Sequence, residues 1–495
     1  MTPQISTPEC IVSKDERLVK QITPKTEDFS RWYVEIIQKT ELADYAPMKG
    51  MMVIRPYGYA IWEHIQRLMD QRIKATGHVN AYFPLFIPES FLQKEAEHVE
   101  GFSPQVAWVT VGGKEELEER LAVRPTSEAI IGHMYSKWIK SWRDLPILIN
   151  QWANIVRWEK VTRPFLRTTE FLWQEGHTCH ETYEEAQKET LLILAMYKEF
   201  VETELAIPVL AGRKTWREKF AGAQETYAIE GLMSDGKALQ MGTSHNLGQH
   251  FSKVFDIRFE DRSQKLQYVW QTSWGVSTRL VGALIMSHGD DSGLRLPPHV
   301  APIQVVIVPI SLGNWKETVI PAVLAAEEIL KKAGVRVYTD TREEFTPGWK
   351  FAEHEMRGVP LRIEIGPRDV KSGQAVLVRR DTMKRETSPL DALGAKVPAL
   401  LEDIQASLYQ EACTFQEQNT HEARTYDEFK DILDTKRGFV KSLWCGGEAC
   451  EDKIKDETMA TIRIIPLEIK DKLVHGACVC CSKEAKALVY FARAY

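Results

Sequence analysis

Two short alternating segments joined by a long basic connection constrain the fold of this chain more than any other feature. Polar and apolar residues alternate near 151–159 and again over 171–177, which is the period of a β-strand. The connection, 160–170, carries three cationic side chains and one proline and is long for a hairpin loop. We therefore predict an antiparallel pair of strands whose loop can bind an anion, although a solvated basic loop would have the same composition.

The length and composition of the chain bound its organisation. At 495 residues it exceeds what a single hydrophobic core supports, so we expect about two to four domains. A net charge of −6 argues against a general polyanion-binding protein, although a local basic face remains compatible with nucleic-acid binding. No apolar run reaches the length of a membrane span, and 1–25 lacks the apolar core of a signal peptide. We therefore predict a cytoplasmic protein with no membrane-spanning segment.

Cysteine usage indicates a metal site near the C-terminus. Five of the eight cysteines fall within 445–481, which in a long chain favours a metal site in a reducing compartment over disulfides. Two close-spaced pairs brought together supply the four thiolates of a structural Zn²⁺ site. The predicted ligands are Cys445, Cys450, Cys478 and Cys481, with Cys480 as an alternative to Cys481.

Hydrophobic periodicity in the first half predicts three helices and one unusual strand. Apolar residues recur at helical spacing over 29–37, 57–75 and 183–205. The extended apolar stretch 79–88 is interrupted by Pro84. Because proline cannot donate to a β-ladder, we expect this strand at a sheet edge or at an interface.

The pattern changes after residue 301, where strands and helices alternate. A continuous apolar, β-branched run at 303–310 is typical of a strand buried on both faces. The elements predicted after it are helices at 315–333 and 347–357 and strands at 335–339, 361–365 and 374–378. This order predicts a small mixed α/β domain.

Charge and periodicity in the last third suggest two further features. Eight Lys/Arg residues against three acidic ones in 357–385 would form a solvated face by default, or a surface that contacts phosphates. Beyond about 388 the chain is expected to be helical as far as 442, with a strand later at 460–465.

Polar residues at two helix starts are candidates for a binding site. Thr126 and Glu128 face the same way in an extended chain, although the same pair would also suit the N-terminus of a helix at 129–139. Arg279 begins an apolar helix at 280–286, and an arginine is rarely buried without an anionic partner.

The glycine-containing stretch 240–245 is a third candidate. If it is extended, alternation places Thr243 and His245 on the side opposite Gln240. Gly242 permits a close approach of the backbone to a ligand. A lone histidine in such a stretch is more often structural than functional.

In this order the motifs resemble those of class II aminoacyl-tRNA synthetases, and more closely the prolyl-tRNA synthetases of the archaeal and eukaryotic type, over roughly 28–495. The segment that ends at Pro84 is similar to the family's first motif, and 157–159 with its loop and Phe171 to the second. The third corresponds to 275–289 with Arg279. The stretches that distinguish the proline-specific members of the class match 125–128, 175–177 and 242–245. The four-cysteine module and Tyr495 are also features of this family.

The resemblance implies an α/β (α+β) fold with several domains. An N-terminal extension at 1–25 would precede an antiparallel-sheet class II catalytic domain at 26–298. A mixed α/β anticodon-binding domain would occupy 299–398, and a small C-terminal zinc-binding domain 399–495. The first motif also implies a homodimer.

The resemblance further implies a reaction and assigns residues to it. L-Proline would react with ATP to give prolyl-adenylate and pyrophosphate, and the prolyl group would pass to the 3′ end of tRNA(Pro), with Mg²⁺ neutralising the triphosphate. The residues implied at ATP are Arg157, Glu159, Arg167, Thr168, Thr169, Phe171, Gln240, Thr243, Ser277 and Arg279. Those implied at proline are Thr126, Glu128, Arg157, Trp173, His177, Phe220 and His245.

Two alternatives remain open: a class II synthetase for another amino acid, and a synthetase-like paralogue that binds RNA without catalysis. Arg157, Glu159 and Arg279 argue against the second, because a non-catalytic protein need not retain them. An apolar pocket discriminates against a smaller amino acid by only about 1–3 kcal/mol for each missing methylene. We therefore expect the enzyme to activate some alanine or cysteine in place of proline. The segment 178–274 is too short for a large editing insertion.

Overall fold

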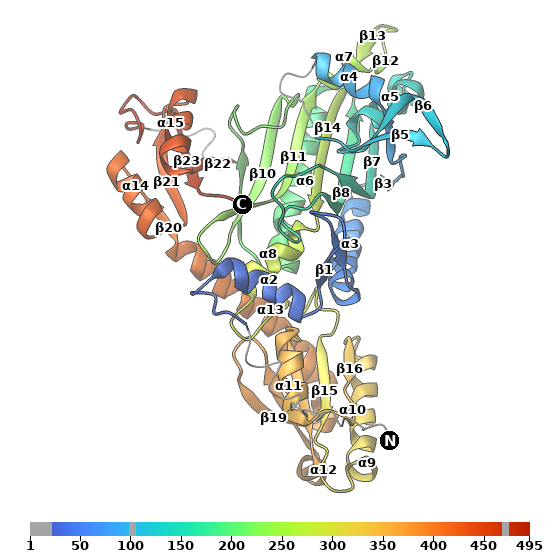
Figure 1. The fold of residues 1–495 in the computed structure, drawn as a ribbon, viewed down its shortest axis with the longest axis vertical. Coiled ribbons are helices and arrows are strands. Elements are labelled where there is room, and N and C mark those ends of the chain that lie inside the picture. The colour runs from blue at the N-terminus through green and yellow to red at the C-terminus, as the bar shows by residue number, and fades with distance from the viewer. Residues whose placement is uncertain (1–21, 99–104, 468–474) are drawn as a thin grey trace, which may run out of the picture. The chain divides into compact units, whose positions relative to one another are not determined.

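The computed structural model describes residues 22–98, 105–467 and 475–495, which divide into two compact units (Figure 1). The larger unit comprises Ala43–Ser287 and Leu408–Tyr495. The smaller comprises the described residues up to Leu42 together with His288–Ser407. Among the described residues, none of the helices has both the length and the apolar character needed to cross a membrane.

An 11-stranded sheet is the framework of the larger unit. Neighbouring strands are antiparallel except at the two edges, where β3 runs parallel to β7 and β20 parallel to β21. Its strands, in spatial order, are β20 (Thr420–Glu422), β21 (Phe439–Trp444), β23 (Ala487–Ala492), β22 (Thr461–Pro466), β9 (Val209–Arg213), β10 (Glu225–Leu232), β11 (Ala238–Gly248), β14 (Trp270–Ser277), β8 (Glu170–His180), β7 (Ile147–Val156) and β3 (Val79–Asn80).

The predicted antiparallel hairpin is confirmed as β7 and β8, with Ile155 opposite Phe171. The first strand, β7, ends three residues earlier than its alternation suggests. The backbone N–H of Arg157 still donates to Thr169 O at 2.8 Å, but that of Glu159 donates to Arg157 O at 2.7 Å and turns the chain. Arg157 and Glu159 therefore lie in the loop that follows β7.

Several helices pack on the large sheet, and two of the predicted helices are among them. The predicted helices at 57–75 and 183–205 are confirmed as α3 (Pro56–Ala75) and α6 (Tyr183–Glu204). Thr182 caps α6, accepting a hydrogen bond from the backbone N–H of Glu185 at 3.2 Å. The apolar stretch after β14 forms α8 (Arg279–His288), whose side chains are largely buried. The remaining helices of this region are α4 (Glu89–His98), α5 (Glu128–Trp138) and α7 (His250–Val254).

The proline-containing stretch lies at sheet edges, as predicted. Its ends form β3, at one edge of the large sheet, and β4 (Phe86–Pro88), at one edge of a three-stranded sheet. Pro84 lies between them, where no ladder needs its missing N–H. The other short strands are β5 (Trp108–Gly112), β6 (Glu115–Val123), β1 (Ala43–Tyr45), β2 (Met52–Ile54), β12 (Arg258–Glu260) and β13 (Leu266–Tyr268).

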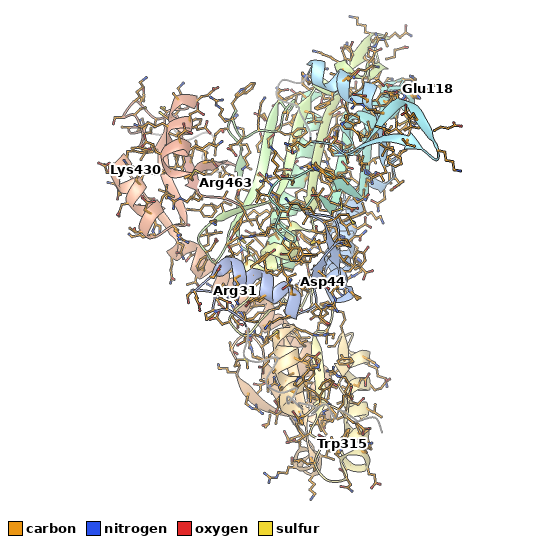
Figure 2. The ribbon with its side chains drawn as sticks, in the orientation of Figure 1. Arg31, Asp44, Glu118, Trp315, Lys430 and Arg463 are labelled. Carbon is orange, nitrogen blue, oxygen red and sulfur yellow. The ribbon has the colours of Figure 1, made fainter. Side chains whose placement is uncertain are left out.

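The C-terminal residues extend the large sheet (Figure 1). Strand β22 pairs with β9, with Ile465 opposite Arg213, and thereby joins the four C-terminal strands to the others. Arg463, labelled in Figure 2, projects from β22. We call 419–495 the C-terminal module; its helices are α14 (Tyr426–Thr435) and α15 (Glu448–Thr458).

The prediction of helix as far as 442 is confirmed over Leu393–Gln418 and in α14, but it is wrong where two strands interrupt it. Helix α13 (Leu393–Gln418) ends before β20, and β21 begins within the segment expected to be helical. Arg437 and Gly438 both have positive φ angles, 61° and 89°, and reverse the chain ahead of β21. Beyond this turn Phe439 and Val440 are fully buried, Val440 in the module core and Phe439 in a cluster with Leu232 and Ala238, which stabilises a strand there.

The smaller unit contains a five-stranded mixed sheet, which confirms the small mixed α/β domain predicted after residue 301. Strand β15 (Val305–Pro309) is buried throughout and runs parallel to both neighbours. The spatial order is β16 (Val337–Thr339), β15, β17 (Leu361–Ile365), β18 (Gln374–Arg379) and β19 (Arg385–Pro389). The α-helices that lie wholly within this unit are α2 (Phe29–Lys39), α9 (Trp315–Thr318), α10 (Ile320–Lys332), α11 (Pro347–Met356) and α12 (Pro367–Ser372).

Two details of this unit differ from expectation. The helix expected at 315–333 is divided into α9 and α10 because Pro321 has no N–H to bond to the preceding turn. Helix α2 is confirmed, capped by Asp28, but it belongs to this unit: Trp32 Nε1 donates to Asp290 O at 3.0 Å.

Candidate active site

One cavity of about 710 Å³ lies on the large sheet beside the loop 157–169. It receives side chains from β8, β11, β14 and from the loops before α5 and β10. The predicted site residues that line it are Thr126, Glu128, Arg157, Glu159, Arg167, Phe171, Trp173, His177, Phe220, Gln240, Thr243, His245, Ser277 and Arg279. The fold thus brings almost the whole predicted set into one cavity.

Thr168 and Thr169 are the two predicted site residues that do not line the cavity. Both are buried, and the hydroxyl of Thr168 donates to Glu170 O at 2.7 Å. The backbone N–H of Thr169 donates to Gly50 O at 2.8 Å, and its carbonyl accepts from Arg157. These bonds fix the base of the loop, and the contact of either threonine with ATP stays a prediction.

A β-bulge in β11 determines which of its side chains face the cavity. Pairing with β10 passes from Ile229–Gly242 to Glu230–Gln240, which leaves Met241 as the extra residue. In a regular strand Gln240 and Thr243 would lie on opposite faces. Because the bulge shifts the alternation, both line the cavity, and the expectation from simple alternation does not hold at Gln240.

A buried carboxylate, Glu175, lines the cavity and is the centre of a polar network. It accepts hydrogen bonds from Gln151 Nε2 at 2.8 Å, from the Ser127 hydroxyl and from His177 Nε2 at 3.0 Å. Burial alone would raise the pKa of Glu175, but the hydrogen bond and charge of His177, with the bonds from Ser127 and Gln151, lower it. Burial alone would lower the pKa of His177, but Glu175 and the charge of Glu128 raise it. The two side chains therefore form an ion pair.

A second carboxylate and two aromatic rings complete this end of the cavity. Glu128 is 8% exposed and accepts a hydrogen bond from the Thr126 hydroxyl. Burial, followed by the nearby charge of His177, lowers the pKa of His245 to about 3, so this ring is neutral. It lies 4.8 Å from the ring of Phe220. Two carboxylates and one imidazolium leave a negative charge beside apolar walls, an arrangement that suits a small organic cation.

Two arginines mark the other part of the cavity. Arg157 Nε donates to Pro125 O at 3.0 Å, and its guanidinium lies 5.7 Å from the ring centres of Phe171 and Trp173. The surrounding protein lowers the pKa of Arg157, and the charges of nearby carboxylates offset part of this lowering. The side chain remains open to solvent through the cavity. Arg279 donates to Leu166 O and Gln240 O, both at 3.2 Å.

Arg279 is a fixed cation that can bind an anion. Burial, with the charges of Arg157 and Arg167, lowers its pKa to about 10, so it remains protonated near neutral pH. Arg167 itself lies 3.3 Å from a carboxylate oxygen of Glu159. Several guanidinium groups converging on one cavity favour a polyanion such as a polyphosphate.

The network around Glu175 contains residues that the site prediction omitted. Ser127, Gln151 and Glu175 touch one another beneath the predicted residues. Strand alternation could have identified Glu175, because it shares a face with Trp173 and His177. Gln151 is its direct cross-strand neighbour, but this register is not visible before the two strands are paired.

The C-terminal module gathers four of its cysteines. The sulfur atoms of Cys445, Cys450, Cys478 and Cys481 all lie within 4.8 Å of one another, and Cys480 is not in this group. Cys445 Sγ is 3.6 Å from Cys450 Sγ and 3.7 Å from Cys481 Sγ, too far for disulfides. A tetrahedron with metal–sulfur bonds of about 2.3 Å has edges of about 3.8 Å, so the residues present fit Zn²⁺.

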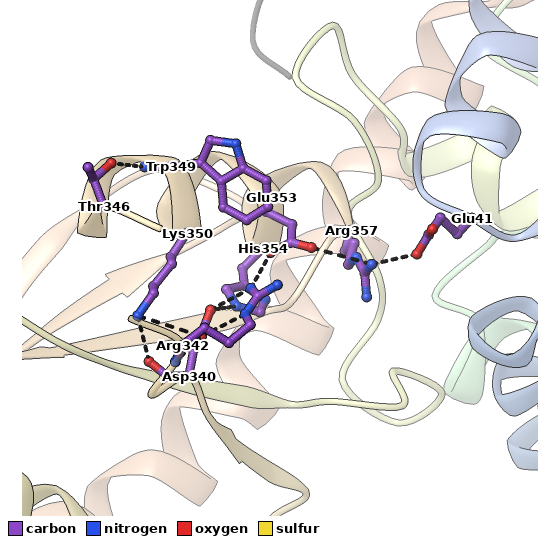
Figure 3. A network of polar contacts seen from close by, with 9 residues as sticks. All are labelled: Glu41, Asp340, Arg342, Thr346, Trp349, Lys350, Glu353, His354 and Arg357. Carbon is purple, nitrogen blue, oxygen red and sulfur yellow. Dashed lines mark hydrogen bonds and ion pairs between the residues drawn. The ribbon is translucent and has the colours of Figure 1, made fainter. Parts of the chain in front are cut away.

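The smaller unit carries a polar network around Asp340 (Figure 3). Arg342 donates to both oxygens of Asp340, at 2.9 Å and 2.7 Å, and also binds Glu353. His354 Nε2 lies 3.0 Å from the same carboxylate. Because these groups already satisfy the carboxylates, the cluster does not call for a metal ion. The guanidinium of Arg342 also lies 5.5 Å from the ring centre of Trp349.

The expected basic surface in 357–385 is not a free cationic strip. Arg362 pairs with Glu355 and Glu364, and Arg380 with Asp290. The other paired arginines of the run are Arg357, Arg379 and Arg385. These ion pairs occupy five of the eight cations of the run, and contact of the run with phosphates stays a prediction.

Comparisons with protein-family models agree with this geometry. A model of the tRNA synthetase class II core domain (G, H, P, S and T) matches 108–288. A model of an anticodon binding domain matches 304–400, and one of the prolyl-tRNA synthetase C-terminal region matches 426–495.

Relatives of known identity match nearly the whole chain. It is 60% identical over 483 residues to the proline–tRNA ligase of Natranaerobius thermophilus, covering 97% of this chain and 99% of that protein. The corresponding enzyme of Clostridium novyi is 55% identical over 98% of this chain and 100% of that protein. The solved structure of Cryptosporidium parvum prolyl-tRNA synthetase with L-proline and AMP superposes with a TM-score of 0.90 at 42% identity, covering 98% and 99% of the two chains. The chain therefore belongs to the prolyl-tRNA synthetases of class II.

Proposed function

We propose that this protein is a proline–tRNA ligase that activates L-proline with ATP and transfers the prolyl group to the 3′ end of tRNA(Pro). The observation that carries this proposal is the division of one cavity into an anionic part, with Glu128 and Glu175, and a cationic part, with Arg157 and Arg279. The anionic part suits the secondary ammonium of proline, and the cationic part suits a nucleoside triphosphate.

At the amino-acid end, Thr126 and Glu128 are proposed to bind the ammonium group. The Glu175–His177 ion pair supports this pocket from below and fixes the orientation of the imidazolium ring. The walls of the pyrrolidine site would be Trp173, His177, Phe220 and His245. Because His245 stays neutral, it does not repel the ammonium group.

At the nucleotide end, the proline carboxylate oxygen attacks the α-phosphorus of ATP and the bond to pyrophosphate breaks. Arg157 is placed to contact both the carboxylate and the α-phosphate, and it stabilises the charge that passes between them. Arg279 and Arg167 would hold the distal phosphates, and Phe171 would stack on adenine. The remaining proposed contacts are Glu159, Thr168, Thr169, Gln240, Thr243 and Ser277. Mg²⁺, when bound with ATP, would neutralise part of the triphosphate charge.

The test of this function is proline-dependent exchange of pyrophosphate into ATP, measured for each proteinogenic amino acid. We expect proline to give the highest kcat/KM, with slower exchange for alanine or cysteine. A preference for threonine or glycine would identify a synthetase of different specificity. Absence of exchange with retained tRNA binding would identify a non-catalytic paralogue.

The smaller unit is proposed to read the anticodon. Phe345 and Trp349 are stacked, with ring centres 3.8 Å apart and planes inclined by 11°, and Arg342 lies 4.9 Å from the Phe345 ring. Aromatic rings beside an arginine bind unpaired bases by stacking. We place the anticodon-binding domain at 299–398, the catalytic domain at 26–298 and the zinc-binding domain at 399–495, after an N-terminal extension at 1–25.

The C-terminal module is proposed to hold a structural Zn²⁺ through Cys445, Cys450, Cys478 and Cys481. The ion would brace the loops after β21 and before β23 against the core of the module. We also assign the protein to the archaeal and eukaryotic architecture. In support, the described chain between β8 and β14 contains no large inserted domain, and free cysteines accord with a cytoplasmic location.

A homodimer is proposed through the edge formed by β3 and β4. Val79 is 61% exposed, Tyr82 71%, and Phe86 and Trp138 each 44%. Large apolar side chains gathered at one edge are characteristic of a protein interface. Sedimentation at micromolar concentration should give a dimer, and substitution of Tyr82 by arginine should shift it towards the monomer. A monomeric wild-type protein would contradict the proposal.

A further inference from the structure

A second cavity lies beside the active-site cavity, where the C-terminal module joins the large sheet. Its volume is about 500 Å³. One wall comes from β9 and β10, with Tyr227, and the other from the ends of β21 and β23, with Trp444. Lys219 and Thr226 line both cavities, so the two are direct neighbours. This second cavity has no part in binding proline or ATP as proposed above.

Among the charged side chains that line the second cavity, the basic ones outnumber the acidic ones. Its basic residues are Arg213, Lys214, Lys219 and Lys486, and its acidic residue is Glu225. Lys214 is neutralised by Glu230, with Nζ 2.6 Å from the carboxylate, and Arg213 is paired with Glu225 at 3.4 Å. Lys486 is exposed, and within 22–98, 105–467 and 475–495 no carboxylate pairs with it. The cavity therefore has positive charge available for an anionic ligand.

An exposed aromatic ring lies next to this charge. Trp216 is 69% exposed, and Lys219 Nζ lies 3.4 Å from its ring centre. Lys219 Nζ also donates to Ala223 O at 2.7 Å, which fixes it over the indole. Exposed rings beside lysine or arginine side chains bind single-stranded nucleic acid, because bases stack on the rings and phosphates contact the cations.

We propose that the second cavity binds the unpaired 3′ end of the tRNA during prolyl transfer. This rests on the proposed function, since the terminal ribose must reach the activated carboxyl group in the active-site cavity. The nucleotides that precede this ribose must then lie on the adjoining surface. Through Lys219 and Thr226 the second cavity adjoins the part of the active site that holds Phe220 and His245, and its charge is complementary to a phosphodiester chain.

Charge reversal at Lys486 tests the proposal. Lys455→Glu is the matched control, because Lys455 is exposed on α15 of the same module and does not line the cavity. Each variant is assayed for proline-dependent pyrophosphate exchange, which needs no tRNA, and for binding of tRNA(Pro) with and without its unpaired 3′ nucleotides. Lys486→Glu should leave exchange unchanged and weaken binding of the complete tRNA about tenfold. It should have no effect on the truncated tRNA, and Trp216→Ala should behave in the same way.

Two results would overturn the proposal. One is that Lys486→Glu and Lys455→Glu weaken binding of the complete tRNA equally. The other is that Lys486→Glu weakens binding of complete and truncated tRNA alike, which would assign the contact to another part of the tRNA. Wild-type exchange with proline is measured in parallel, so failure of the ligase function is distinguished from failure of this site.

Discussion

Arg463 of β22 and Glu230 of β10 form a bidentate ion pair that joins the C-terminal module to the catalytic part of the sheet. Arg463 Nη2 lies 2.9 Å and 3.1 Å from the two carboxylate oxygens of Glu230, which is completely buried. Lys214 Nζ binds the same carboxylate at 2.6 Å. Burial alone would raise the pKa of Glu230, but the charges of Lys214 and Arg463 lower it. The module is thus an integral part of the unit that contains the active site.

Removal of Arg463 should destabilise this unit. Arg463→Met leaves a buried carboxylate with one cation, and we expect the free energy of unfolding in urea to fall by about 3 kcal/mol. Arg217→Met is the control, because it removes an exposed ion pair with Asp452 and should change the free energy by about 0.5 kcal/mol or less. Equal effects of the two substitutions would contradict this role of the buried pair.

The Glu175–His177 pair should make stability depend on pH. The folded-state pKa of His177 is raised, so its ion pair stabilises the protein fully below the unfolded value of about 6.5 and less as pH rises through the folded value. Glu175→Gln removes the partner and lets burial lower the pKa of His177. The difference in unfolding free energy between wild type and variant, measured from pH 6 upward, should therefore shrink. A difference independent of pH would show that His177 is not protonated.

Zinc content should distinguish the two candidate ligands at the end of the module. The sulfur of Cys481 belongs to the four-cysteine group and that of Cys480 does not. Metal analysis of purified Cys481→Ser should show a large loss of bound zinc, whereas Cys480→Ser should retain one ion per chain. The opposite pattern would make Cys480 the fourth ligand.

Trp349 provides a separate test of the anticodon surface. Loss of one base-stacking ring costs about 1–3 kcal/mol, so Trp349→Ala should raise the KM for tRNA(Pro) about tenfold or more and leave pyrophosphate exchange unchanged. Trp315→Ala, on α9 of the same unit, serves as the control and should have a normal KM for tRNA. A normal KM in Trp349→Ala would remove the Phe345–Trp349 stack from RNA recognition.

Local patterns in the sequence were sufficient for elements whose stability is largely local. The strand Leu361–Ile365 has the predicted limits, and α6 begins at the predicted residue because Thr182 and Glu185 cap one another. Pro321 was also visible in the sequence, but a helical apolar pattern continues past it and conceals the break between α9 and α10.

Features that depend on tertiary pairing could not be predicted. The bulge at Met241 exists only when β11 is paired with β10, and it decides the direction of Gln240. The ion pair of Arg380 with Asp290 joins residues that are distant in sequence, so the basic run 357–385 looked unpaired. For the same reason Gln151, which donates a hydrogen bond to Glu175, was omitted from the candidate site, because the register that places it there exists only once β7 and β8 are paired.

The most direct test of the central claim is proline-dependent pyrophosphate exchange by Arg157→Ala. Within the described residues, the side chain of Arg157 donates one hydrogen bond, to Pro125 O, and faces an open cavity, so its loss should leave the protein folded. At saturating ATP and proline, we predict that exchange falls to background while circular dichroism and the thermal unfolding midpoint stay close to those of the wild type. Near-normal exchange by folded Arg157→Ala would contradict the assignment of Arg157 to the reacting carboxylate and α-phosphate.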